Sequence, residues 1–254
     1  MNMPVIYAHR GASFQAPENT MPAFRLAMEL GADGIELDVH LTRDGVPVVI
    51  HDETADRTGT RKGAIKDRTF EEWGDTDFGR WKDPRFAGTK LPALAEVLEL
   101  LAPWHGRLNI ELKTDVERYP GIEQAVLRLV DAVGMRRRVV ISSFHHESLA
   151  VCRQLDGEIE TAALLNRRQP ADVEALLRMG VTAIHPDVRD ATHRQVRAWH
   201  EAGFTVRPWT IDYRLLMLWQ AWNGADAIIT NKPRACAAFL RPLCRRQQDG
   251  EARG

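Results

Sequence analysis

The chain has 254 residues, 44% of them hydrophobic, and its 34 basic and 35 acidic side chains leave a formal charge of −1. This size allows a large buried core, and the near-neutral balance argues against general nucleic-acid binding, which usually shows as a basic surplus. No apolar run reaches the ~18 residues of a membrane span and no signal peptide is apparent. We therefore expect a cytoplasmic protein without stable membrane insertion.

Short apolar runs alternate with amphipathic segments along most of the chain. Repeated strand–helix units imply parallel strands, and eight units that close on themselves form an α/β fold, the (β/α)₈ TIM barrel. We predict one such domain over residues 1–240 and a disordered tail at 245–254. Strands are predicted at 5–9, 35–39, 108–113, 139–144, 161–165, 183–187, 205–211 and 227–230, and helices at 21–31, 91–102, 122–134, 147–155, 171–180, 194–203, 215–224 and 233–243.

The apolar run at 46–52 is interpreted as the return arm of a hairpin after the second strand, because too few residues precede it for a crossover helix. An Asp-Gly turn comes just before it, and such a turn favours a two-residue loop. That loop would pair Leu41 with Val48 and Asp38 with His51. The hairpin would carry His51 to the C-terminal mouth of the barrel, where barrel enzymes place their chemistry.

Residues 53–90 do not follow the strand–helix rhythm. They are rich in Gly, Asp, Arg and Thr, yet they contain five large aromatic side chains. We interpret the segment as a small insertion that caps the barrel mouth, not as a separate domain.

Three carboxylates are expected to converge at the mouth. Glu36 and Asp38 are two residues apart on one strand, so they point to the same side, and Glu111 lies on the next parallel strand. Each alone could be an ordinary strand carboxylate paired with Arg or Lys. Together, inside apolar strands, they favour a metal, because burying unpaired charges costs several kcal/mol each. An all-oxygen site selects Mg²⁺ or Ca²⁺.

Two histidines and two cations fall at neighbouring strand ends. His9 ends the first strand and His51 ends the hairpin return, and a pair of imidazoles suits general acid–base catalysis. Arg10 and Lys113 could bind phosphate oxygens or could merely balance the carboxylates. His185 ends another strand and could also reach the mouth. The remaining aromatic feature is a set of tryptophans at helical spacing, for which we expect core or interhelix positions: Trp199, Trp219 and Trp222.

Three segments resemble the glycerophosphodiester phosphodiesterase family, in its bacterial cytoplasmic form: HRGASFQAPENT at 9–20, IELDVHLTRDGVPVVIHD at 35–52 and ELK at 111–113. SSF at 142–144, PWT at 208–210 and ITNKP at 229–233 match later barrel segments of that family. The similarity extends from His9 to about Pro233.

The resemblance implies a site and an activity. It implies one divalent metal held by Glu36, Asp38 and Glu111, catalysis by His9 and His51, and phosphate contacts from Arg10 and Lys113. It further implies that Glu18 and Asn19 lie near the site and that Trp209 packs against a glycerol moiety, although Trp209 could instead pack at the rim. Asn231 stands where many relatives carry Asp, a difference that we expect to matter little for catalysis.

The resulting hypothesis is metal-dependent hydrolysis of a glycerophosphodiester, such as glycerophosphocholine or glycerophosphoethanolamine, to sn-glycerol 3-phosphate and an alcohol. His9 would be the base, and the expected partner is the small-molecule phosphodiester substrate. One alternative is a phospholipase-D-like hydrolase of lysophospholipids, with the aromatics of 53–90 as an apolar entrance. The other is a non-catalytic phosphodiester-binding protein, against which the intact set of histidines and carboxylates argues. The choice between Mg²⁺ and Ca²⁺, the nucleophile and the oligomeric state stay open.

Overall fold

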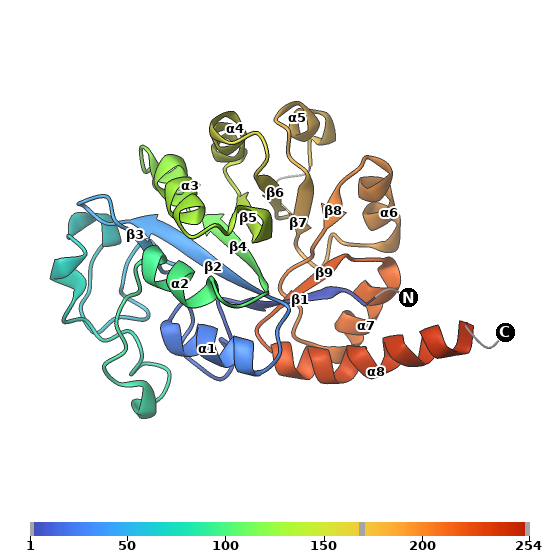
Figure 1. The fold of residues 1–254 in the computed structure, drawn as a ribbon, viewed down its shortest axis with the longest axis horizontal. Coiled ribbons are helices and arrows are strands. Elements are labelled where there is room, and N and C mark those ends of the chain that lie inside the picture. Colours follow the sequence, from blue (N-terminus) through green and yellow to red (C-terminus); the bar gives the residue numbers. More distant parts are fainter. Residues whose placement is uncertain (1–2, 168–170, 252–254) are drawn as a thin grey trace.

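The parallel sheet forms the centre of the molecule (Figure 1). The computed structural model describes residues 3–167 and 171–251, and side chains up to residue 244. Within this part the sheet has nine strands, and all but β3 (Pro47–Val49) run parallel in the order β8-β7-β6-β5-β4-β2-β1-β9. The parallel strands are β1 (Val5–His9), β2 (Gly34–Leu41), β4 (Arg107–Leu112), β5 (Val139–Ser143), β6 (Glu160–Leu165), β7 (Ala183–Pro186), β8 (Thr205–Val206) and β9 (Ala227–Thr230).

Backbone hydrogen bonds between the segments of β8 and β9 close the sheet into a barrel. The Asp226 amide donates to the Val206 carbonyl at 2.9 Å, and the Ile229 amide donates to the Pro208 carbonyl at 3.2 Å. β8 ends much earlier than the predicted strand at 205–211, since Pro208 has no amide to donate to a ladder. The predicted (β/α)₈ barrel is confirmed.

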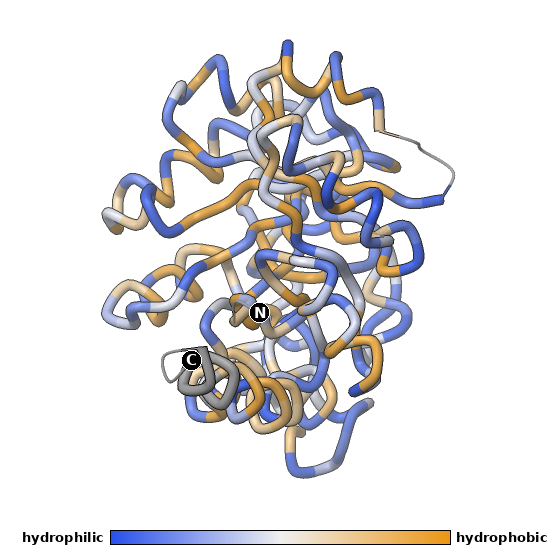
Figure 2. The backbone as a smooth tube through the Cα atoms, turned by 90° about the vertical axis from the view of Figure 1, so that its right-hand side faces the viewer, coloured by the Kyte–Doolittle hydropathy of each residue, from blue (hydrophilic) through white to orange (hydrophobic). Residues whose placement is uncertain are grey.

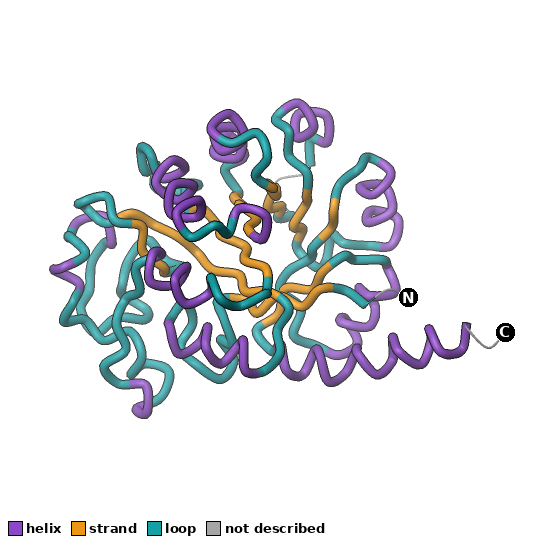
Figure 3. The backbone as a smooth tube through the Cα atoms, viewed as in Figure 1, coloured by secondary structure: helices purple, strands orange, loops and turns teal. Residues whose placement is uncertain are grey.

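Helices surround the barrel (Figures 1 and 3). None of the described helices is long and apolar enough to cross a membrane. α8 continues through Glu251, into the tail for which disorder was predicted, because Arg, Gln and Glu are good helix formers; residues 252–254 lie outside the described residues. The helices are α1 (Met21–Glu29), α2 (Leu94–Leu101), α3 (Ile122–Ala132), α4 (His146–Leu155), α5 (Val173–Arg178), α6 (His193–Glu201), α7 (Arg214–Asn223) and α8 (Pro233–Glu251).

β2 shows how the barrel sorts its side chains. All eight of its residues are buried. Ile35 and Leu37 belong to the large apolar cluster between strands and helices, and burying each such side chain contributes about 1.5–3 kcal/mol. Alternation then places Glu36 and Asp38 on the inner side. Figure 2 shows hydrophobic residues along much of the central strands and hydrophilic ones in many of the outer turns.

The hairpin after β2 forms, but its register differs by one residue from the prediction. Leu41 pairs with Pro47, not with Val48. The loop spans residues 43–45, because the Thr42 amide bonds the Val46 carbonyl at 3.1 Å and Gly45 takes a left-handed φ of 78°. A three-residue loop with glycine in that conformation is the next common hairpin type after the two-residue one.

The shifted register means that the predicted pairing of Asp38 with His51 is wrong. The Asp38 carbonyl instead accepts from the Ile50 amide at 3.1 Å. β3 ends at Val49, so the ladder no longer dictates the direction of His51. That side chain nevertheless lines the cavity at the barrel mouth.

The insertion at 53–90 has a small apolar cluster of its own, in which Trp73 and Phe78 pack beneath Val48 and Ile50 of the hairpin. Its regular structure consists of the 3₁₀ turns Ile65–Asp67, Glu71–Trp73 and Pro84–Phe86. It also contacts the loop after β1, because Lys82 Nζ donates to the Ser13 carbonyl at 2.7 Å. Most of its aromatic surface is therefore used internally, although Trp81 remains 40% exposed.

Candidate active site

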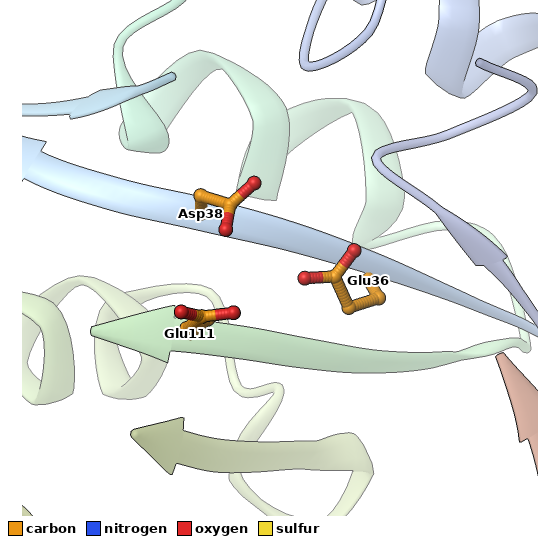
Figure 4. A group of neighbouring side chains, drawn as sticks. All are labelled: Glu36, Asp38 and Glu111. Atoms are coloured by element: carbon orange, nitrogen blue, oxygen red, sulfur yellow. The ribbon is translucent and has the colours of Figure 1, made fainter. Parts of the chain in front are cut away.

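The three predicted metal ligands come together at the C-terminal end of the barrel (Figure 4). Asp38 on β2 stands beside Glu111 on β4 in the strand register. Each of the three residues offers one carboxylate oxygen, and these oxygens of Glu36, Asp38 and Glu111 lie within 4.8 Å of one another. All three residues are buried. The E-x-D spacing placed two carboxylates on one side of β2, and the parallel register brought the third to them.

Burial, together with repulsion between the carboxylates, changes the protonation of this cluster. Burial raises the pKa of Glu36 well above its ordinary value, and the charges of Asp38 and Glu111 raise it further. Burial also raises the pKa of Glu111 to about 7, although Lys113 opposes the change. The neighbouring cations therefore do not fully balance the cluster, and without a metal ion Glu36 and Glu111 retain protons to higher pH than usual.

Asp38 behaves differently because cations surround it. Burial by itself would raise the pKa of Asp38, but Arg10, His51 and Lys113 hold it below its usual range. Its Oδ2 accepts from Asn19 Nδ2 at 2.7 Å. Its Oδ1 is buried and has no hydrogen-bond partner among the described residues. A free carboxylate oxygen within an all-oxygen cluster is what a hard divalent cation requires.

Arg10 and Lys113 flank the carboxylates and line the same cavity of about 110 Å³. Arg10 Nε lies 3.3 Å from Asp38 Oδ2, and Lys113 Nζ donates to Glu111 Oε1 at 2.8 Å. Lys113 is buried, and although burial alone would lower its pKa, the neighbouring Glu111 and Asp38 raise it. Both side chains therefore remain charged at the site.

A tight turn after β1 aims the Arg10 backbone at the cluster. The Arg10 amide donates to Glu36 Oε2 at 2.8 Å. Arg10 and Gly11 both have positive φ angles, of 55° and 78°. A Cβ on Gly11 would stand 2.8 Å from Ala23, so the close approach of α1 requires glycine there.

His9 lies at the edge of the cluster, with Nε2 3.9 Å from Glu36 Oε2. Its Nδ1 is 2.7 Å from Asn231 Oδ1, and Asn231 Nδ2 donates to Asp212 Oδ2 at 2.6 Å. Because Asp212 only accepts, it fixes the Asn231 amide with Oδ1 toward His9. His9 Nδ1 must then carry the proton, and Nε2 presents a lone pair to the cavity. Burial and the nearby Arg10 lower the pKa of His9 to about 4.

His51 also lines the cavity but has a charged partner. Its Nδ1 lies 2.6 Å from Asp52 Oδ1, and Arg57 Nε holds the other Asp52 oxygen at 2.8 Å. Burial would raise the pKa of Asp52, yet the hydrogen bonds from Arg57 and His51 lower it to about 2. The two histidines therefore differ: an amide orients His9, and an ionised carboxylate orients His51.

The predicted supporting residues take less direct positions. Glu18 receives Arg10 Nη1 at 2.9 Å and Arg57 Nη2 at 2.7 Å, whereas Asn19 holds Asp38. Neither is among the residues that line the cavity. They support the groups that do.

Apolar side chains complete the lining of the cavity. They are Trp209, Phe144, Leu164 and Ile229. The rings of Trp209 and Phe144 meet edge to face at 5.7 Å, and Trp209 Nε1 donates to the His185 carbonyl at 2.8 Å. His185 itself does not line the cavity and contacts Arg207 instead.

Sequence reasoning missed the partners of the two histidines. Asn231 was expected to have little bearing on the site, yet its side chain touches His9. Asp52 could have been recognised, since it follows His51 directly. Asp212 gave no local signal, because barrel closure alone brings it to Asn231.

The chain was compared with known proteins. The model of the glycerophosphoryl diester phosphodiesterase family matches residues 9–235. The chain belongs to this family. It is 39% identical over 237 residues to a glycerophosphodiester phosphodiesterase of Caldanaerobacter subterraneus, an alignment that covers 93% of this chain and 98% of that protein. Similar identity, 39% over 236 residues, is found with a glycerophosphodiester phosphodiesterase of Bacillus altitudinis, covering 91% and 96% of the two chains.

Solved structures agree with this assignment. An Oleispira antarctica phosphodiesterase in complex with the product sn-glycerol-3-phosphate has a TM-score of 0.87 and 29% identity, over 94% of this chain and 97% of that one. A glycerophosphodiester phosphodiesterase of Agrobacterium tumefaciens has a TM-score of 0.81 and 30% identity, over 93% and 100% of the two chains. The protein is thus an enzyme of glycerophosphodiester hydrolysis.

Proposed function

We propose that the cavity at the barrel mouth hydrolyses small glycerophosphodiesters, such as glycerophosphocholine and glycerophosphoethanolamine, to sn-glycerol 3-phosphate and the free alcohol. The observation that carries the proposal is one cavity lined by two histidines with different partners, two cations and two carboxylates, Glu36 and Glu111, that cluster with the buried Asp38. The Oleispira relative binds sn-glycerol-3-phosphate, which supports the same product here.

The carboxylate cluster fits one divalent cation. Glu36, Asp38 and Glu111 would hold Mg²⁺ or Ca²⁺, and the unpartnered Asp38 Oδ1 supports this. When bound, the ion would supply Lewis acidity toward a phosphoryl oxygen and lower the pKa of a coordinated hydroxyl. The pKa values of Glu36 and Glu111 are raised because their ionised forms are poorly stabilised. A bound cation would stabilise those ionised forms.

Arg10 and Lys113 bind the phosphate in this proposal. Both line the cavity, and each is anchored by a carboxylate of the cluster. Fixed cations beside the phosphoryl group stabilise charge that develops on its oxygens during displacement. The wall formed by Trp209 and Phe144 packs against the carbon atoms of the glycerol moiety.

The partners of the two histidines suggest their roles. His9 presents an unprotonated Nε2 to the cavity and has a lowered pKa, so it accepts a proton from the nucleophile. That nucleophile is either water, which gives sn-glycerol 3-phosphate directly, or a glycerol hydroxyl, which gives a cyclic phosphate that water then opens. Asp52 holds His51 through its Nδ1 at 2.6 Å and so orients the ring, and in this proposal His51 gives a proton to the departing alkoxide. General acid–base catalysis of this kind contributes roughly 10²–10⁴-fold.

The experiment is a coupled assay of glycerol 3-phosphate release from glycerophosphocholine and glycerophosphoethanolamine. We expect turnover, its loss on chelation, and its recovery with Mg²⁺ or Ca²⁺. His51→Ala should lower kcat by roughly 10²–10⁴-fold. Activity that survives both chelation and His51→Ala would contradict the mechanism.

Adding a lysophospholipid to the substrates in the assay tests the phospholipase-D-like alternative. Phe14 is 59% exposed and Trp81 is 40% exposed, and such side chains could contact an acyl chain. We expect glycerophosphocholine to be turned over faster than lysophosphatidylcholine; the reverse order would favour the phospholipase-D-like alternative. Binding without turnover of either substrate in metal-containing buffer would favour a non-catalytic protein.

A cytoplasmic location is also part of the proposal. Cys152, Cys236 and Cys244 are all free and buried. Free thiols suit a reducing compartment.

A further inference from the structure

Helix α7 exposes an apolar stripe. Leu215 is 80% exposed, Trp222 is 70% exposed and Trp219 is 39% exposed. Their spacing of four and three residues places them in one line on the helix surface. The core or interhelix position predicted for Trp219 and Trp222 is therefore wrong, whereas Trp199 of α6 is buried as predicted.

The fold does not need this stripe. The opposite side of α7 attaches the helix to the barrel, through the buried Met217, Gln220 and Ala221. Residues Leu215, Trp219 and Trp222 are also absent from the lining of the catalytic cavity. The stripe is thus surface that neither barrel packing nor the proposed chemistry uses.

The exposed area is comparable to the largest apolar patch of a typical monomer. Because an aromatic side chain covers roughly 150–250 Å², the three side chains together expose on the order of 400 Å². That approaches the largest apolar patch of a typical monomer, roughly 300–600 Å², and such patches are often functional. It also supplies about half of the ~800 Å² that one partner contributes to a standard interface.

We propose that this stripe packs against the same stripe of a second copy of the chain, across a two-fold axis. A two-fold interface must be self-complementary: if one residue contacts a second residue of the partner, that second residue contacts the first residue of the partner in the same way. The stripe meets this condition, since Leu215 precedes Trp219 by four residues and Trp222 follows it by three. In an antiparallel pair, Trp219 lies at the axis and Leu215 faces the partner subunit's Trp222.

Charge supports the antiparallel arrangement. Between Tyr213 and Ala225 the only charged residue is Arg214, at the N-terminal end of α7. Antiparallel packing brings it toward the C-terminal end of the partner's α7, where free carbonyls and the dipole are negative. Asp226 follows at that end but already pairs with His200 at 2.8 Å, so the carbonyls and the dipole of α7 supply most of the complementary charge. In the single chain Arg214 Cζ lies 5.9 Å from the centre of the Phe239 ring of α8.

The same observations disfavour a lipid surface as the occupant. Helices that lie on membranes combine an apolar face with a polar face rich in Lys and Arg. The other face of α7 is buried in the barrel, and the helix has a single cation. Depletion of charge with enrichment of Trp is typical of the centre of a protein–protein interface.

The first test is the mass of the protein by light scattering and sedimentation. Between ~1 and ~100 µM chain, a range that reveals micromolar dissociation constants, we expect a dimer. The double variant Leu215→Asp, Trp222→Asp should be monomeric, with circular dichroism and activity per chain within twofold of the parent. The matched control Leu155→Asp, at a 49% exposed position on α4, should remain dimeric.

The second test locates the axis. Trp219→Cys should form a disulfide-linked dimer under mild oxidation, whereas Leu155→Cys should not; the three native cysteines are buried. Mixed Leu215→Cys and Trp222→Cys chains should crosslink with each other more readily than either does with itself. A wild-type monomer across the whole range, or a dimer that survives the double variant, would overturn the proposal. So would a monomer that binds phosphatidylglycerol vesicles through the stripe.

Discussion

The two ends of the barrel both bury charged side chains, but they balance them differently. At the mouth, Glu36, Asp38 and Glu111 meet in one cluster, and the pKa of Glu36 and of Glu111 is raised. At the opposite end, the buried Arg207 pairs with the Glu160 carboxylate and lies 3.3 Å from His185 Nε2. Arg107 Nη1 stands 4.0 Å from the other oxygen of Glu160.

The difference separates function from stability. At the opposite end, the buried cation is paired with a carboxylate of the protein. The pair stabilises the structure, and its charges are not available to a ligand. At the mouth, the carboxylates outnumber their cationic partners, so the fold holds like charges together at a cost in free energy. A bound cation can reduce that repulsion. Residues at the C-terminal end of barrel strands usually serve catalysis, and those at the N-terminal end usually serve stability.

The largest effect should follow from removing a central charge at the mouth. Asp38→Asn should lower kcat/KM by ~10³-fold or more, since it removes a metal ligand and the partner of Arg10. The protein should fold normally, as judged by its melting curve. Asp44→Asn, in the exposed hairpin loop of the same strand pair, is the matched control and should retain full activity. Equal losses in both variants would contradict the assignment.

Metal should stabilise the mouth more at high pH than at low pH. The folded pKa of Glu111 is about 7 against an ordinary 4.5, so the metal-free folded state keeps a proton that the unfolded chain has lost. The stability that the raised pKa of Glu111 contributes is therefore fully present below pH 4.5 and is lost as the pH rises to about 7. It amounts to on the order of 3 kcal/mol.

The measurement is the rise in melting temperature on adding Mg²⁺ or Ca²⁺, at pH 5 and pH 8. His9 changes the stability of the metal-free protein in the opposite direction, because its pKa is lowered, so the metal-induced increment is the quantity to compare. We expect a larger increment at pH 8, and a weaker pH dependence in Glu111→Gln. An increment independent of pH would argue against a proton-coupled carboxylate site.

At the opposite end of the barrel, Arg207→Met should destabilise the folded protein but leave its catalytic activity intact. It leaves Glu160 without its main partner, and the expected loss is about 2 kcal/mol, since Glu160 keeps some solvent exposure. Urea denaturation measures the loss, and kcat per folded molecule should be unchanged. Arg107→Met, which removes the longer and more exposed contact, should cost less than ~1 kcal/mol. A change in kcat would mean that the two ends are coupled.

The smallest effect on catalysis should come from the group behind His9. Asn231→Ala should lower kcat by roughly 10–100-fold, as for other residues that orient a catalytic ligand, with KM nearly unchanged. Nitrogen-15 shifts of the His9 ring should report loss of the Nδ1-protonated tautomer. Ser13→Ala is the control, since that hydroxyl also bonds Asn231 Oδ1 but does not touch the ring. An unaltered tautomer and kcat would remove Asn231 from the mechanism.

The hairpin shows where local pattern stops being sufficient. The Asp-Gly pair correctly indicates a turn between residues 41 and 47, but the sequence allows both a two-residue and a three-residue loop. The choice depends on the twist and packing of the finished strands. One residue of difference changes every cross-strand pair, and it separated Asp38 from His51 in the ladder.

Local periodicity determined the barrel, the inward direction of Glu36 and Asp38, and the strand ends that carry His9 and Glu111, because side chains alternate along any strand whatever surrounds it. Tertiary structure alone decided the partner of His9, since Asn231 lies 222 residues away and reaches it only when β9 closes on β1. It also decided that Trp219 and Trp222 face outward: helical spacing groups them on one face, and only the packing of α7 against the barrel determines which face is buried.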